Sequence, residues 1–282
     1  MIALVGDEFN RLLPCRNDNT YKGSFGILGA VVGSRPYQGA AVYSVLAALR
    51  SGVGIAVAYI PDDIYVPFAS KVNGAVVEPL HSRDGAVCDE SLCSRLSARR
   101  VNTVLCGCGL SLSDGSFSAV KQVLSTELPV VLDGDGITLA SRDSLLIRRD
   151  VPTVITPHLG EFSRLCDRTV DEVIRNREEL LSEFTVKHNC ITVLKDSFTM
   201  ICDKNGDIYK LSRPCSALSK GGSGDVLAGF IASFISQGIG GLDSAICAVT
   251  LHNACGHMCS EKFGARYSQP DDYINMLSHF KV

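Results

Sequence analysis

The chain has 282 residues, of which 46% are hydrophobic and 20% are charged, a composition typical of a folded globular protein rather than a disordered one. Its 27 basic and 30 acidic residues give a net charge of −3, which offers no overall attraction for nucleic acid or an anionic membrane. We therefore expect neither a nucleic-acid partner nor a membrane partner.

Short apolar runs alternate with longer helical patterns along most of the chain. Helices are expected over residues 40–50 and 114–125, and strands over residues 25–33, 53–60, 101–106, 130–132, 153–155 and 191–194. Short β-branched runs separated by helices predict an α/β fold with a central, mainly parallel sheet and helices on both faces. We expect residues 1–282 to form a single domain.

The pattern changes after Lys195. Two runs, 198–202 and 208–211, flank Asp203-Lys-Asn-Gly206, which is typical of a hairpin turn. From Ser223 onward the chain is predicted to be helical, with interruptions at 238–241 and around 268–270.

The twelve cysteines are spread from Cys15 to Cys259 without a CxxC pair, which favours reduced thiols over a disulfide scaffold or a zinc ribbon. The tightest group is His252, Cys255, His257 and Cys259. Buried thiols on a core helix are the simpler interpretation of this group, and a metal site is the alternative. The N-terminus has neither the basic start nor the apolar run of a signal peptide, so we expect a cytoplasmic protein.

The most informative segment is Lys220-Gly-Gly-Ser-Gly-Asp225, at the start of a predicted helix. Glycines let the backbone approach a ligand, and the free N–H groups of a first helical turn attract phosphate oxygens. Asp225 lies in the same turn, where a simple anion site would not place a negative charge. A carboxylate there suits a base that accepts a hydroxyl proton during phosphoryl transfer, while a helix cap is the alternative.

Three further segments follow predicted strands, where α/β sheets place ligand groups. Asp133-Gly-Asp135 could position a metal–phosphate complex, or it could form a polar turn. Thr156-Pro-His-Leu-Gly-Glu161 brings an imidazole and a carboxylate together, with a structural histidine as the alternative. Lys195 could meet phosphate or ribose, or it could be a solvated lysine.

Together and in this order, these segments resemble the ADP/ATP-dependent NAD(P)H-hydrate dehydratases, carbohydrate-kinase-like members of the ribokinase-like superfamily. The resemblance extends from about Leu12 to Leu277, and the Thr-Pro-His-x-Gly-Glu motif is its most specific part. The other matching segments are Leu13-Pro-Cys-Arg16, Tyr21-Lys-Gly-Ser-Phe-Gly26, Gly33-Ser34, Gly39-Ala-Ala41, Ala47-Ala-Leu-Arg-Ser-Gly-Val-Gly54, Val131-Leu-Asp-Gly-Asp135, Val193-Leu-Lys195 and Gly221-Gly-Ser-Gly-Asp-Val-Leu-Ala-Gly229.

The resemblance implies repair of the S epimer of NADH or NADPH hydrate, with ADP expected as the phosphoryl donor, ATP as the other possibility, and AMP and phosphate as the products with ADP. Asp225 would contact the hydrate and act as the base, and Ala40, Gly109 and His158 would also hold the hydrate. The nucleotide would be bound by Lys195, Asp196, Ser197, Phe198, Thr199, Gly222, Ser223 and Gly224. Nucleotide chemistry implies Mg²⁺, although no set of metal ligands is evident in the sequence.

The resemblance also implies a homo-oligomer, with a tetramer expected from bacterial relatives. Because the chain begins at the first strand of this domain, the companion epimerase is expected to be a separate protein of the same pathway.

The chain departs from the family pattern in four segments. Gly107-Cys-Gly-Leu-Ser111 replaces Gly-Pro-Gly-Leu-Gly, Asp133-Gly-Asp-Gly-Ile-Thr138 replaces Asp-Ala-Asp-Ala-Leu-Asn, and Arg213-Pro-Cys-Ser-Ala-Leu-Ser219 replaces Thr-Gly-Asn-Pro-Gly-Met-Ala. Asp196 stands where the family has glycine, which places a negative charge near the expected phosphates.

These departures keep two alternatives open. One is a kinase of the same superfamily that phosphorylates a vitamin precursor, although it would leave the Thr-Pro-His-x-Gly-Glu motif unexplained. The other is a catalytically inactive nucleotide-binding sensor, which would have no need for a carboxylate at position 225.

Overall fold

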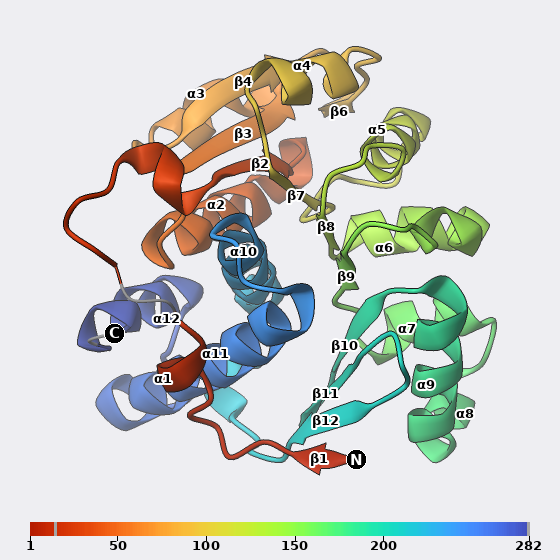
Figure 1. Cartoon of the computed structure of the whole chain (residues 1–282). Helices are drawn as coiled ribbons and strands as arrows, with labels where there is room; N and C mark the ends of the chain where they lie inside the picture. Colours follow the sequence, from red (N-terminus) through yellow and green to blue (C-terminus); the bar gives the residue numbers. More distant parts are fainter. Residues whose placement is uncertain (14–15, 281–282) are drawn as a thin grey trace.

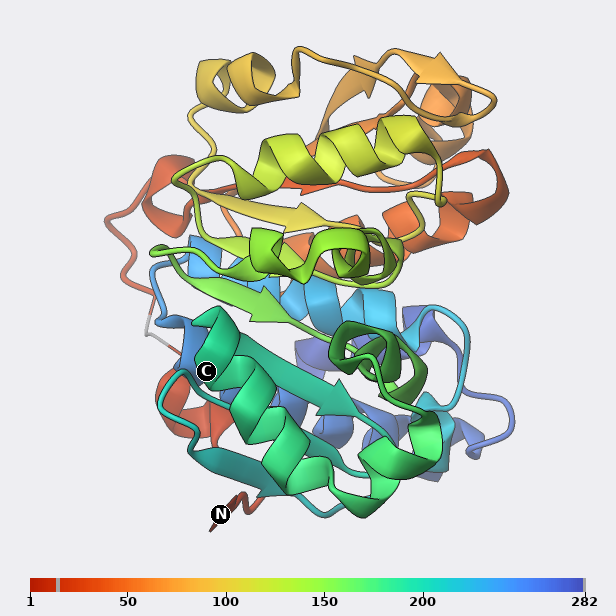
Figure 2. The same cartoon turned by 90° about the vertical axis from the view of Figure 1, so that its right-hand side faces the viewer.

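The computed structural model describes residues 1–13 and 16–280, so Pro14 and Cys15 of the first matching segment lie outside the described residues. The main feature is a 10-stranded sheet with the order β1-β12-β11-β10-β9-β8-β7-β2-β3-β4. Helices cover both of its faces (Figures 1 and 2). The predicted architecture is therefore confirmed.

The strands of the main sheet are β1 (Ile2–Ala3), β2 (Ile27–Val31), β3 (Ile55–Pro61), β4 (Val76–Leu80), β7 (Thr103–Cys106), β8 (Val130–Leu132), β9 (Thr153–Ile155), β10 (Ile191–Lys195), β11 (Thr199–Cys202) and β12 (Ile208–Leu211). All neighbours pair in parallel except β11, which runs antiparallel to both β10 and β12. The predicted hairpin is thus β11–β12. A separate ribbon pairs β5 (Ser82–Arg83) with β6 (Ala86–Val87).

The central strands agree with the sequence prediction, whereas the two edge strands were missed. β8 and β9 have the predicted bounds, because both are fully buried β-branched or leucine runs. The edge strand β4 contains Glu78 and Pro79 and is partly exposed, and β1 has only two residues. Edge strands tolerate proline and charge, so they lack the continuous apolar pattern by which a buried strand is identified.

The helices are α1 (Phe9–Leu12), α2 (Gln38–Arg50), α3 (Tyr65–Ala69), α4 (Leu92–Ala98), α5 (Asp114–Leu124), α6 (Asp135–Ala140), α7 (Leu159–Cys166), α8 (Val170–Arg175), α9 (Arg177–His188), α10 (Ser223–Ser236), α11 (Gly241–Phe263) and α12 (Pro270–Met276). Helices α2, α10, α11 and α12 lie on one face of the sheet and α5, α6, α7 and α9 on the other (Figure 1). None of the helices in the described ranges combines the length and apolar content needed to cross a membrane.

Two hydrophobic cores result from this layering, one on each face. Along β3, Ala58 and Ile60 face the core shared with α2 and α10, while Val57 and Tyr59 face the opposite core. Such alternation is what a strand buried on both faces requires.

Helix α10 is buried along almost its whole length and packs against α2. At Gly229 the two helices approach so closely that a Cβ atom would lie 2.3 Å from the backbone oxygen of Ser44. Glycine at this position therefore permits the close packing. The packing places the first turn of α10 at the carboxyl edge of the parallel strands, where ligands of open α/β sheets bind.

Candidate active site

The glycine-rich segment forms the turn that leads into α10, and the predicted helix start at Ser223 is confirmed. Gly222 precedes the helix with a φ of 93°, and a Cβ there would lie 2.7 Å from the ring of Tyr43. A Cβ on Gly221 would meet nothing within 4 Å, so the space above this turn is open. The turn can therefore accept a ligand against the N–H groups of the first helical turn.

Buried polar side chains from three neighbouring strand ends meet beside α10. Lys195 ends β10, and its Nζ donates a hydrogen bond of 2.8 Å to Oδ1 of Asp133, which follows β8. Thr156, which follows β9, donates its hydroxyl to the same carboxylate oxygen. The sequence had marked all three strand ends, and the structure shows that they form one hydrogen-bonded group.

Cys108 and Asp225 complete this group. The Cys108 thiol lies after β7, and its Sγ donates to Oδ2 of Asp133 at 3.7 Å. Ligand atoms of Cys108, Asp133 and Asp225 all lie within 4.8 Å of one another. Asp225, which is half-buried, therefore lies next to a second and fully buried carboxylate.

The two carboxylates differ in their protonation. Burial raises the pKa of Asp225 to about 7, and the negative charge of Asp133 adds to this effect. Burial also opposes ionisation of Asp133, but the charge and hydrogen bond of Lys195 outweigh it and lower the pKa of Asp133. Asp133 is thus ionised at neutral pH, whereas Asp225 can take up and release a proton near neutral pH, as a general base must.

The group formed by Cys108, Asp133 and Asp225 does not suit Mg²⁺. Mg²⁺ prefers an octahedral shell of oxygen ligands, whereas one of the three ligands is a thiol. The ammonium of Lys195 also already occupies one oxygen of Asp133. No second group of three possible ligands occurs in the described ranges. Asp135 instead accepts a hydrogen bond of 2.8 Å from the backbone N–H of Ser111, which ties the loop 107–111 to α6.

His158 is the N-cap of α7. Its Nδ1 accepts hydrogen bonds from the N–H groups of Gly160 at 3.0 Å and Glu161 at 3.3 Å, and Glu161 Oε2 accepts from the His158 N–H at 2.9 Å. Burial and the charge of Lys195 lower the pKa of His158, so the imidazole is neutral and carries its proton on Nε2. His158 thus has a structural role as the cap of α7, which was the alternative to a ligand contact. Its imidazole also lines a cavity.

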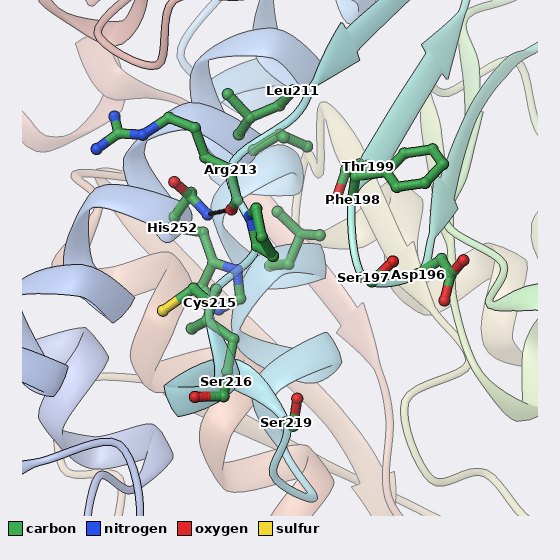
Figure 3. A pocket seen from close by; sticks show the side chains of 15 residues that line it. Asp196, Ser197, Phe198, Thr199, Leu211, Arg213, Cys215, Ser216, Ser219 and His252 are labelled. Carbon is green, nitrogen blue, oxygen red and sulfur yellow. Dashed lines mark hydrogen bonds between the residues drawn. The ribbon is translucent and has the colours of Figure 1, made fainter.

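Two adjoining cavities lie beside α10. The larger, of about 530 Å³, opens between the loop 213–219, the strand β11 and α11 (Figure 3). The smaller, of about 470 Å³, reaches the glycine turn. Six residues line both: Asp196, Thr199, Leu218, Ser219, Leu227 and His252. Leu218 and Ser219 of the loop 213–219 thus face both cavities.

Most of the predicted site residues line these cavities. The larger contains Asp196, Ser197, Phe198 and Thr199, and the smaller contains His158, Lys195, Asp196, Thr199, Ser223 and Gly224.

Four predicted site residues line neither cavity: Ala40, Gly109, Gly222 and Asp225. Ala40 and Gly109 contact each other, since a Cβ on Gly109 would lie 2.8 Å from that of Ala40. Gly109 directly follows Cys108, so the pair is next in the chain to a member of the carboxylate group. The ring of Phe198 also points elsewhere, because it packs against Arg177 and Lys210.

The sequence did not identify His252 as a site residue, although it marked the helix that carries it. His252 lines both cavities, and its Nε2 lies 3.3 Å from Oγ of Ser223. Burial and the charge of Lys195 lower the pKa of His252 to about 3, so the ring is neutral. Cys255 and Cys259 are buried free thiols on the same helix. A contact across 29 residues of sequence leaves no local signal.

Comparison with known proteins identifies relatives that cover nearly the whole chain. Residues 28–278 match the family model of NAD(P)H-hydrate dehydratase. A curated relative, the ADP-dependent (S)-NAD(P)H-hydrate dehydratase of Bacillus subtilis, is 30% identical over 255 residues, which are 90% of this chain and 88% of the relative. A bifunctional NAD(P)H-hydrate repair enzyme from Moorella thermoacetica is 28% identical over 95% of this chain. The chain spans about half the length of the bifunctional relatives.

Solved structures agree with the sequence match. The crystal structure of the Bacillus subtilis ADP/ATP-dependent NAD(P)H-hydrate dehydratase, co-crystallised with ATP and Mg²⁺, superimposes with a TM-score of 0.81 at 26% identity. That match covers 98% of this chain and 95% of the other. A ribokinase-like superfamily protein of Enterococcus faecalis reaches a TM-score of 0.85 at 24% identity, covering 99% of this chain and 94% of that protein. The fold is therefore ribokinase-like.

The raised pKa of Asp225 predicts that this residue destabilises the folded protein at high pH. A carboxyl with a raised folded-state pKa contributes fully to stability below its unfolded pKa, and that contribution is lost as the pH rises through about 7. Asp225→Asn should therefore raise the melting temperature at pH 8 by roughly 2–6 °C, with the difference shrinking toward pH 5.

Thermal unfolding monitored by circular dichroism between pH 5 and pH 8.5 measures this effect. Asp133→Asn is the matched control, since it should lower the melting temperature by removing the buried partner of the half-buried Lys195. A stability change in Asp225→Asn that is the same at every pH would contradict the assigned protonation.

Proposed function

Because this chain belongs to the NAD(P)H-hydrate dehydratase family, we propose that it converts the S epimer of NADH or NADPH hydrate back to NAD(P)H, with ADP or ATP as the phosphoryl donor. ADP is the expected donor, since the stand-alone curated relatives are ADP-dependent enzymes. The observation that carries the proposal is Asp225, a half-buried carboxylate with a pKa raised to about 7 in the first turn of α10.

We assign the larger cavity to the adenine nucleotide and the smaller to its terminal phosphates and the adjoining part of the hydrate. The N–H groups of Gly224 and Asp225 in the first turn of α10 would hold the transferring phosphoryl group, since the Ser223 N–H already donates to the Lys220 carbonyl. Lys195 lies close by, since a Cβ on Gly224 would come within 3.2 Å of its Nζ. Mg²⁺ would accompany the phosphates of the nucleotide and neutralise their charge, as it commonly does in phosphoryl transfer.

In the proposed reaction, Asp225 accepts the proton of the ring hydroxyl as the hydroxyl oxygen attacks the terminal phosphorus. The bond from that phosphorus to its bridging oxygen breaks, and AMP leaves when ADP is the donor. The carbon–oxygen bond of the phosphorylated ring then breaks, and phosphate departs with the electron pair. Loss of a proton from the neighbouring ring carbon restores the double bond. Removing a proton at the moment of attack is the task of a base with a pKa near the working pH.

Three further features are proposed on the strength of the family alone. The chain acts as one domain, it forms a homo-oligomer such as a tetramer in the cytoplasm, and a separate epimerase supplies the S epimer. The bifunctional names of several relatives support a link between the two repair steps.

Recovery of absorbance at 340 nm tests the proposed reaction. Purified protein with freshly prepared NADH hydrate, Mg²⁺ and either ADP or ATP should regain this absorbance, and the nucleotide required identifies the donor. Asp225→Asn should lower turnover at least a hundredfold, because a positioned base contributes about 10²–10⁴ in rate, while nucleotide affinity stays within a few fold. Nucleotide binding without recovered absorbance would contradict the proposal and favour a kinase or a sensor.

The two functions of His158 can be separated by comparing two variants. His158→Ala removes both the cap and the imidazole, whereas His158→Asn keeps a good capping group. Both should raise KM for the hydrate at least fivefold and leave nucleotide affinity unchanged, whereas the alanine variant alone should lose about 1 kcal/mol of stability.

Steady-state kinetics, nucleotide titration and denaturant unfolding provide the three readouts for these variants. Full hydrate binding by His158→Asn would show that the residue serves only as a cap.

A further inference from the structure

Asp196 places a carboxylate at the rim of the site. It lines both cavities, and Figure 3 shows it across the larger cavity from His252. A free negative charge at this position would repel a polyphosphate. The carboxylate is not free, because Oδ2 of Asp196 accepts a hydrogen bond of 2.9 Å from Nη2 of Arg177. The Arg177 side chain is 12% exposed and that of Asp196 is 30% exposed, so solvent reaches this ion pair mainly from the side of Asp196.

The position of Arg177 is not explained by helix formation. It is the first residue of α9, where the helix dipole disfavours a cation. Its Nε is buried and has no hydrogen-bond partner. Both features cost free energy, so another interaction must stabilise the guanidinium in this position. Its contact with Asp196 is that stabilising interaction.

A second contact holds the guanidinium in place. Its central carbon lies 4.6 Å from the centroid of the Phe198 ring, and Nζ of Lys210 lies 4.2 Å from the same centroid. Phe198 is two residues beyond Asp196, so Arg177 contacts the segment 195–199 at two points: the carboxylate of Asp196 and the ring of Phe198. This contact also explains why the Phe198 ring points away from the larger cavity.

We propose that Arg177 is a positioning residue for the nucleotide: it neutralises Asp196 and holds that carboxylate out of the path of the phosphates. The inference rests on the proposed nucleotide site. The ammonium of Lys195 pairs with Asp133 rather than with Asp196, so Arg177 is the cation that pairs with Asp196. Arg177 thus allows a segment with an aspartate next to Lys195 to accept a highly charged ligand.

The proposal predicts that the effect of Arg177 grows with the charge of the nucleotide. Without its partner, Asp196 repels each phosphate group, so Arg177→Met should weaken ATP binding by roughly tenfold, ADP binding less, and AMP binding least. Arg177→Lys keeps the charge and should retain most of the affinity. Methionine keeps the apolar stem over Phe198, so packing on the ring is largely preserved.

Isothermal titration of the full chain with AMP, ADP and ATP measures these affinities. Arg177→Met, Asp196→Asn and the double variant form a thermodynamic cycle, in which Asp196→Asn should restore the ATP affinity of Arg177→Met to within about threefold of wild type. Lys210→Met is the matched control. It removes the other positive charge that lies over the Phe198 ring but leaves the ion pair of Asp196 with Arg177 intact, so it should change ATP affinity less than threefold.

An equal loss for all three nucleotides, or no rescue by Asp196→Asn, would overturn the inference and assign Arg177 a purely structural role. If Arg177→Met does not fold, Arg177→Lys and Asp196→Asn decide the case. Both should bind ATP within about threefold of wild type, and a tenfold loss in either variant contradicts the proposal. Failure of the wild-type protein to bind any of the nucleotides would overturn the proposed function itself.

Discussion

The ion pair between Lys195 and Asp133 organises the candidate site. It joins the ends of β10 and β8 across β9, and the hydroxyl of Thr156 from β9 completes the bridge. The pair keeps Asp133 ionised in a buried place, and the resulting negative charge helps to hold a proton on Asp225 up to about pH 7. Because Lys195 bonds to Asp133 and not to Asp225, the two carboxyl groups have different pKa values.

Burial of this group costs free energy, and the surrounding helices compensate for it. Helix α10 carries Asp225 into the interior because Gly229 lets it pack tightly on α2, and Gly222 turns the chain sharply before the helix. A protein selected for stability alone would have little reason to retain an aspartate with a raised pKa at such a position. The N–H groups of Gly224 and Asp225 in the same first turn remain available to a ligand.

The local sequence pattern was sufficient to predict the central strands and the glycine turn. It also singled out the residues Asp133, His158 and Lys195 at the ends of strands. These features depend on short-range rules: buried strands are apolar, and ligand groups follow strands. The pairing of Lys195 with Asp133 spans 62 residues, and that of Arg177 with Asp196 joins a helix start to a strand end. Such contacts depend on how distant segments fold together, so sequence spacing does not show them.

The sequence also does not predict the direction in which individual side chains point. Phe198 belongs to the segment expected to bind nucleotide, yet its ring packs on the opposite side against two cations. His158 was expected as a ligand contact, and the structure shows in addition that it caps α7. A motif identifies the segment that reaches a site, whereas the neighbours of each side chain decide which way it points.

The dependence of kcat/KM for NADH hydrate on pH, with the nucleotide saturating throughout, tests the central claim most directly. If Asp225 must be ionised to accept the hydroxyl proton, kcat/KM should be level above about pH 7 and fall tenfold for each pH unit below it. A value of kcat/KM that stays constant from pH 8.5 down to pH 5.5 would contradict the account, because it would mean that no base with a raised pKa takes part.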